Sequence, residues 1–148
     1  VHQPRGLKWH VPSHEISPDF STSLQKFINH VDIVVTIHGF GREGFFTSLL
    51  LGGRNRNLAG HVSTHLKQHL PMYEICDDLE TIPSDLRGLH DDNPVNLPRL
   101  GGVQLELPPR VRGVGRFWKD WVGDGLTPHT ESLITALIAS SIAWQNQK

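Results

Sequence analysis

The sequence predicts an α/β fold with a mixed, mostly parallel sheet that is flanked by helices. Residues 31–37 are mostly Val and Ile and carry one charge, Asp32, which is typical of a strand buried on both faces near the centre of a parallel sheet. Short apolar runs at 47–51 and 102–107 indicate further strands. Helical patterns separate these runs, and alternating strands and helices are the signature of this fold class.

The elements follow one another along residues 1–148 as a single domain. A helix is predicted from Asp19 or Ser21 to about His30, a second over 54–70, and a third from Thr127 or Pro128 to about Gln145. A short strand at 72–76 precedes a long irregular connection over 77–98. Connections of that length are usually functional or disordered. In the last helix, the side chains expected to face the core are Leu133, Leu137, Ile138, Ile142 and Trp144.

Composition excludes several classes of protein. A net charge of −1 and 20% charged residues do not indicate a nucleic-acid or membrane binder. The one cysteine, Cys76, cannot form an intramolecular disulfide. No signal peptide or apolar run of membrane-spanning length is present, so a cytoplasmic location is the default expectation, and the oligomeric state is unknown. The chain starts at Val1 without an element start signal, and we expect it to be the C-terminal portion of a longer catalytic domain.

His38 is the first candidate for chemistry. It ends the predicted strand 31–37 and precedes a glycine-rich turn, and open α/β sheets bind ligands at the carboxyl ends of their strands. Glu106 is the second candidate, because strand alternation places it on the same face as Gln104 and between apolar neighbours that would raise its pKa. The alternatives are a histidine that ends a strand and bonds a loop, and a glutamate that faces solvent.

Metal-assisted hydrolysis suits these residue types best. It needs histidine or carboxylate ligands with an open position, and a carboxylate that takes a proton from water. The sequence has no G-x-S-x-G elbow for a serine nucleophile, no P-loop and no dinucleotide-binding fingerprint. His61, His65 and His69 recur every four residues, but a solvated helix face is the more common origin of such a pattern.

The sequence resembles the poly-γ-glutamate hydrolase family over most of residues 7–110. The resemblance rests on five stretches in the family's order: Trp9-His10-Val11-Pro12-Ser13, Val34-Val35-Thr36-Ile37-His38-Gly39, Leu50-Leu51-Gly52-Gly53, Asn93-Pro94-Val95-Asn96 and Gly102-Val103-Gln104-Leu105-Glu106-Leu107. It implies a fold similar to the zinc carboxypeptidases and a zinc-dependent amidohydrolase that cleaves γ-glutamyl amide bonds. By this likeness, His38 matches the last zinc ligand and Glu106 the catalytic carboxylate. His10 and Asn96 match positions that line the site.

One departure from the family pattern concerns the metal. The family takes its first two zinc ligands from an upstream stretch, H-G-G-G-x-E, that should precede Trp9 and is absent from this sequence. His38 and Glu43 have the same spacing as that motif, but the residues that follow resemble those after the last ligand. We therefore keep His38 as the last ligand. The adjacent pair His14-Glu15 is a weaker substitute, because neighbours on an extended chain point to opposite faces.

The substrate implied by the resemblance is an acidic glutamyl-containing peptide. Such a polyanion needs cations, and arginine binds carboxylates through two parallel hydrogen bonds. The candidates are Arg54, Arg56, Arg99, Arg110 and Arg112. Arg99 is preferred, because it ends the loop that carries Asn93 and Asn96, which are also predicted to bind substrate. The alternative function is a metal-free binding or structural module that retains the fold without catalysis.

Overall fold

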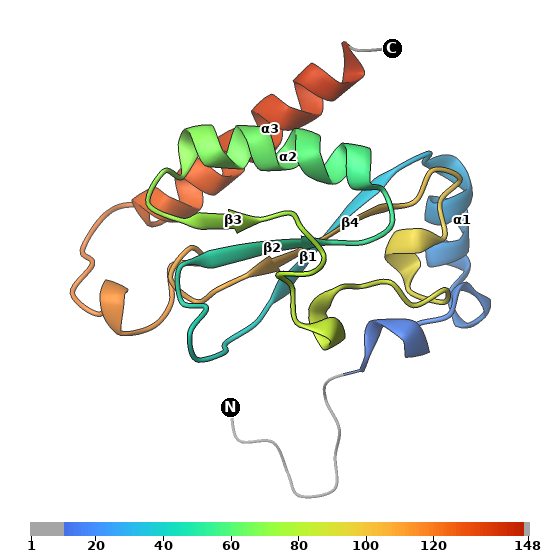
Figure 1. Ribbon diagram of the computed structural model, residues 1–148, viewed down its shortest axis with the longest axis horizontal. Helices are drawn as coiled ribbons and strands as arrows, with labels where there is room; N and C mark the ends of the chain where they lie inside the picture. Colours follow the sequence, from blue (N-terminus) through green and yellow to red (C-terminus); the bar gives the residue numbers. More distant parts are fainter. Residues whose placement is uncertain (1–10, 147–148) are drawn as a thin grey trace, which may run out of the picture.

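The computed structural model describes residues 11–146 and contains a mixed sheet with helices packed against it (Figure 1). The strands are β1 (Val34–Gly39), β2 (Ser48–Gly52), β3 (Glu74–Cys76) and β4 (Gly102–Leu107), and the α-helices are α1 (Thr22–His30), α2 (Arg56–His69) and α3 (Pro128–Gln145). The strand order is β1-β4-β2-β3. β1 pairs with β4 and β2 with β3 in parallel, whereas β2 and β4 are antiparallel. The predicted α/β class and mostly parallel sheet are confirmed.

Side-chain caps explain where the first two helices begin. The Ser21 hydroxyl accepts a hydrogen bond from the backbone N–H of Leu24, and the Asn55 side chain accepts one from Leu58. Each cap satisfies one of the backbone donors that a helix leaves unpaired at its start. The third helix has Pro128 in its first turn, where a missing N–H costs nothing.

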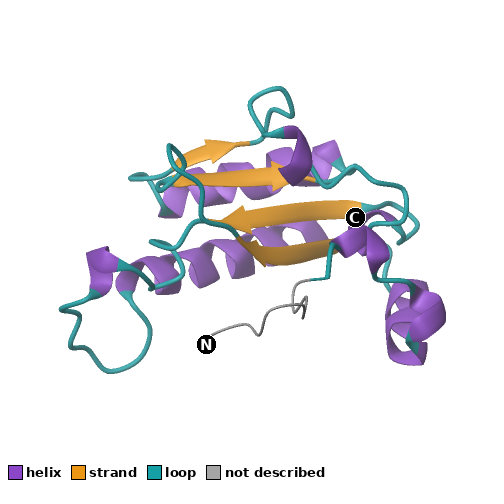
Figure 2. Ribbon diagram, turned by 90° about the horizontal axis from the view of Figure 1, so that it is seen from below, coloured by secondary structure: helices purple, strands orange, loops and turns teal. Residues whose placement is uncertain are grey.

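The two faces of the sheet have different coverings. Helices α2 and α3 lie side by side on one face, as the view from below also shows (Figure 2). The core on that face includes Leu51, Leu58, Val62, Leu105 and Leu133. The opposite face carries a smaller cluster of Phe40, Leu50, Cys76 and Ile82. Even-numbered positions of β4 therefore point away from α2 and α3, towards the side that the loops cover.

The predicted position of the strand at 31–37 is wrong. β1 occupies an edge of the sheet formed by residues 11–146, and β4 lies between it and β2. Ile37 is 55% exposed, whereas all six residues of β4 are buried. An apolar run indicates that a strand tends to be buried, but it does not indicate which other strands will pair with that strand.

The predicted inner face of α3 is partly wrong. Leu133 is buried, and Leu137 and Trp144 pack against the core as expected. Ile138 and Ile142 are each 56% exposed, while Ala136 and Ser140 are buried in their place. This helix has apolar side chains around most of its circumference, so its periodicity does not select a face. Within residues 11–146, no helix is both long and apolar enough to cross a membrane.

Candidate active site

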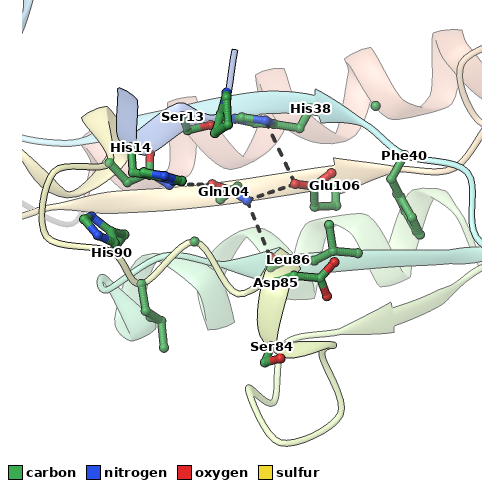
Figure 3. A pocket seen from close by; sticks show the side chains of 15 residues that line it. Ser13, His14, His38, Phe40, Ser84, Asp85, Leu86, His90, Gln104 and Glu106 are labelled. Carbon is green, nitrogen blue, oxygen red and sulfur yellow. Dashed lines mark hydrogen bonds and ion pairs between the residues drawn. The ribbon is translucent and has the colours of Figure 1, made fainter. Parts of the chain in front are cut away.

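A cavity of about 430 Å³ lies on the loop-covered face of the sheet (Figure 3). Strands β1 and β4 form its floor, and the loops at 12–14 and 84–93 form its walls. Its lining residues include Ser13, His14, His38, Phe40, Asp85, His90, Asn93, Gln104 and Glu106. The structure therefore brings the two main candidates, His38 and Glu106, into one cavity.

His38 and Glu106 face each other across the parallel pair β1 and β4. They are register partners, and the distance from His38 Nδ1 to Glu106 Oε1 is 4.0 Å. The Glu106 side chain is 5% exposed and that of His38 is 29% exposed. On the other side of Glu106, its register partner on β2 is Leu50. The carboxylate thus has apolar surroundings on one side and the imidazole on the other.

A chain of side-chain amides fixes the orientation of Glu106. Asn93 Nδ2 donates a hydrogen bond of 2.8 Å to Gln104 Oε1. Gln104 Nε2 in turn donates one of 2.9 Å to Glu106 Oε1, which Figure 3 shows as a dashed line. Both amides are buried, so each group depends on the other for a partner. Sequence reasoning placed Gln104 beside Glu106 but missed its role. Asn93 was predicted to contact substrate. It does line the cavity, but its side-chain amide donates a hydrogen bond to Gln104.

Asn96 holds the loop that forms one wall of the cavity. Its Nδ2 donates to the carbonyl oxygens of Gly88 at 2.8 Å and His90 at 2.9 Å, and its Oδ1 accepts from the backbone N–H of Arg54. Gly88 has a φ of +64°, and a Cβ there would lie 2.6 Å from Gln104 Oε1. Glycine at this position therefore lets the loop backbone lie directly on the amide chain.

Two further histidines lie on the cavity wall away from His38. The rings of His14 and His90 are 4.9 Å apart, centroid to centroid. Nothing in the sequence pattern singled out His90. His10, which was predicted to bind substrate, lies outside the described residues.

Arg99 is not brought into the cavity. Its Nε donates to Asp32 Oδ1 at 2.9 Å, and Asp32 precedes β1, at the end of the strand remote from His38. Its predicted contact with substrate stays a prediction. A different arginine reaches the cavity wall: Arg42 forms two hydrogen bonds with Asp85, which lowers the pKa of that carboxyl.

No group of three or more His, Cys, Asp or Glu side chains that could hold a metal is found within residues 11–146. The helical histidines make other contacts: the imidazole Nε2 of His61 is 2.9 Å from the Ser140 carbonyl oxygen, and its ring packs against Trp144. Burial is the main cause of the lowered pKa of His65, and repulsion from His61 and His69 is a smaller one. Glu43 is exposed and does not line the cavity.

Comparisons with known proteins show the family and the fold of this chain. The sequence model of the poly-gamma-glutamate hydrolase family matches residues 2–132, so the chain belongs to the poly-gamma-glutamate hydrolase family. A solved structure of a bacteriophage poly-gamma-glutamate hydrolase superposes with a TM-score of 0.72 at 20% identity, covering 94% of this chain and 64% of that one. A zinc-free apo form of a protein named YNDL superposes with a TM-score of 0.60 at 19% identity, covering 88% and 64%.

These comparisons confirm the predicted family and the α/β fold. The chain spans less than two thirds of the length of either solved structure. A sequence comparison with curated proteins finds no match.

Proposed function

We propose that the chain is the C-terminal part of a hydrolase that cleaves γ-glutamyl amide bonds in glutamyl polymers. Family membership supplies the class of reaction. The observation that carries the proposal is the position of Glu106, a buried carboxylate that opens onto a cavity 4.0 Å from His38 and is oriented by Gln104. A buried, hydrogen-bonded carboxylate that opens onto a cavity is uncommon unless it has a task.

Glu106 is the proposed general base and general acid. Its carboxylate takes a proton from a water molecule while the water oxygen forms a bond to the amide carbon of the substrate. When the carbon–nitrogen bond then breaks, the same carboxyl group delivers the proton to the leaving nitrogen. Gln104 and Asn93 contribute by holding the carboxylate in one orientation, so that less reorganisation is needed during the reaction.

His38 is the proposed zinc ligand of this part of the protein. The residues described here offer one ligand position rather than a set of three, so they do not form a complete catalytic zinc site. We propose that the remaining ligands lie outside residues 11–146, as the resemblance to the family implies. Zinc, when bound, would polarise the amide carbonyl and favour ionisation of water. The zinc-free form of a protein with a similar fold supports zinc as the metal.

The incomplete ligand set also favours a second candidate, a binding module that retains the fold and recognises glutamyl chains without cleaving them. Both candidates use the same cavity and the same acidic peptide. They differ in whether zinc is bound and whether the polymer is shortened.

Two measurements test the proposal. Zinc content after equilibrium dialysis is compared between the 148-residue chain and the full-length protein, each with a His38→Ala control. We expect weak binding to the chain alone and tight, His38-dependent binding to the full-length protein. Tight stoichiometric zinc on the short chain that is lost in His38→Ala would contradict the placement of the other ligands.

The second measurement follows the length of poly-γ-glutamate by size-exclusion chromatography after incubation with the full-length protein and zinc. Shortening of the polymer that a chelator abolishes is the expected result. An intact polymer, together with binding of the polymer to the protein, would favour the binding module instead.

A further inference from the structure

We propose that Arg42 binds a carboxylate of the substrate at the cavity wall, and that the Asp85 carboxylate occupies this position until substrate displaces it. The inference rests on the proposed function for the substrate class, an acidic γ-linked glutamyl chain. It deepens that function by naming the cation that selects acidic residues and the internal carboxylate that competes for this cation.

The cavity lining offers few cations to a polyanionic ligand. Among the lining residues that the structure describes, none is a lysine or an arginine. Asp85 lines the cavity, and its carboxylate would repel an acidic chain if it were unpaired. Within residues 11–146, Arg42 is the arginine that forms an ion pair with a side chain of the lining. Arg42 is therefore the cation that an acidic ligand in this cavity can reach by replacing Asp85.

Arg42 already holds a carboxylate in the geometry that arginine uses for such ligands. Its Nη1 donates a hydrogen bond of 3.2 Å to Asp85 Oδ1, and its Nη2 donates one of 2.6 Å to Asp85 Oδ2. Two parallel bonds of this kind match the planar fork of a guanidinium to the two oxygens of one carboxylate. Each γ-linked glutamyl residue retains an α-carboxylate with the same two oxygens. Asp85 thus occupies the position that a substrate carboxylate would take.

The backbone around Arg42 is anchored to the sheet. Phe40 lines the cavity, and its backbone N–H donates a hydrogen bond of 3.1 Å to the carbonyl oxygen of Leu107, the last residue of β4. The Phe40 ring is buried in the cluster on the loop-covered face. The backbone N–H of Phe45 donates at 3.2 Å to the carbonyl oxygen of Arg42, which closes a turn. An anchored turn reduces the entropy that is lost when its side chain binds a ligand.

Asp85 lies one residue away from the contact that its loop makes with the amide chain of the site. The carbonyl oxygen of the next residue, Leu86, accepts a hydrogen bond of 3.5 Å from Gln104 Nε2. The same Nε2 donates to Glu106, and Figure 3 shows both bonds as dashed lines. Ser84, on the other side of Asp85, also lines the cavity. The ion pair of Arg42 and Asp85 therefore belongs to the wall of the cavity that contains Glu106.

The ion pair is accessible enough to exchange. The side chain of Arg42 is 41% exposed and that of Asp85 is 62% exposed. Exposed ion pairs contribute little to stability, because water solvates both partners when they separate. A substrate carboxylate can therefore replace Asp85 at small cost, and Asp85 then turns to solvent. Without substrate, the pair keeps the guanidinium at the cavity wall.

Calorimetric titration of the full-length protein tests the exchange, with a chelator present so that no hydrolysis occurs. The probes are a γ-linked glutamyl oligomer and the same oligomer with its α-carboxylates converted to neutral amides. The variants are Asp85→Asn, alone and combined with Arg42→Ala. Glu80→Gln is the matched loss of an exposed, paired carboxylate, and Lys67→Ala in the Asp85→Asn background is the matched loss of an exposed, paired cation. Circular dichroism checks that each variant is folded.

We expect Asp85→Asn to tighten binding of the acidic oligomer about two- to fivefold, because Arg42 no longer has to leave an internal partner. Removal of Arg42 from that variant should weaken binding roughly tenfold, the usual worth of a hydrogen-bonded charge pair at an accessible site. Glu80→Gln, and Lys67→Ala in the Asp85→Asn background, should change the affinity little. Affinity for the neutral oligomer should be the same in all these proteins.

Three results would overturn the proposal. An unchanged or weaker affinity in Asp85→Asn would show that Asp85 does not compete for the cation. Equal losses from Arg42→Ala and Lys67→Ala in the Asp85→Asn background would show a general effect of charge. Failure of the parent protein to bind the acidic oligomer would remove the subsite.

Hydrolysis is measured separately with zinc added to the full-length protein. Binding that follows the expected order, without hydrolysis, would defeat the proposed enzyme but not this assignment. Hydrolysis with a KM for the acidic oligomer that is unchanged in Asp85→Asn would defeat this assignment alone.

Discussion

Replacing Gln104 with Met removes the amide that links Asn93 to Glu106 while retaining a side chain of similar length. In the parent protein, Gln104 accepts at 2.8 Å from Asn93 and donates at 2.9 Å to Glu106, and all three side chains are buried. The variant leaves the Asn93 N–H without its partner and removes a hydrogen bond from a carboxylate. Each loss costs about 1–3 kcal/mol, and because neighbouring terms do not simply add, we expect a total of about 2–5 kcal/mol.

This loss is large enough to measure by thermal denaturation. A change of 1 kcal/mol lowers the midpoint by about 2–4 °C in a domain of this size. Gln68→Met is the matched control, because Gln68 is exposed on α2 and should leave the midpoint unchanged.

The pH dependence of activity shows whether Gln104 orients Glu106 or only fills space in the core. The hydrogen bond from Gln104 favours the ionised form of the carboxylate, so the acidic limb of the pH–rate profile should move to higher pH in Gln104→Met. A variant with the parent's midpoint and the parent's pH profile would refute the view that Gln104 orients Glu106.

Three further predictions concern the loop wall and two buried groups. Asn96→Ala removes three hydrogen bonds that hold the cavity wall. The KM for substrate should therefore rise, and the midpoint of thermal unfolding should fall by an amount corresponding to about 1–3 kcal/mol. An unchanged KM would show that other contacts hold the wall. Burial raises the pKa of Tyr73 to about 12, so the stability of the folded protein should fall as the pH rises from about 10 to about 12. Tyr73→Phe should lessen that fall. If an absorbance titration gave this single tyrosine an ordinary pKa, the result would contradict the account. Burial raises the pKa of Cys76, the only cysteine, to about 11, so a thiol reagent should react slowly until the protein is unfolded, and fast labelling of folded protein would contradict this.

The sequence predicted most elements because their signals are local. The strand at 102–107 matches β4 residue for residue, since its alternation and the following Pro108-Pro109 define both the faces and the end. The helix predicted over 54–70 corresponds to α2, because a four-residue apolar repeat and the following Pro71 are both local signals. The misplaced β1 and the wrongly turned face of α3 depend on tertiary neighbours, which periodicity does not encode.

In the candidate site, too, the features with local sequence signals could be predicted and those that depend on tertiary neighbours could not. His38 and Glu106 could be predicted because each stands out on its own strand, and their 4.0 Å approach follows from parallel pairing in register. The role of Gln104 as the link between Asn93 and Glu106 depends on the folded loop and could not be read from spacing. Arg99 was preferred because it ends the loop of Asn93 and Asn96, yet the fold carries it to Asp32 at the other end of β1.

The substitution Glu106→Gln in the full-length protein tests the central claim most directly, with melting temperature, zinc content and turnover measured on the same sample. The amide is nearly isosteric with the carboxylate, so fold and zinc content should be retained, while turnover falls by roughly 10²–10⁴-fold, the usual worth of a positioned acid–base group. The acidic limb of the pH–rate profile should disappear with it. A folded, zinc-loaded variant that turns over at the parent's rate would contradict the assignment of Glu106 as the proton-transferring group.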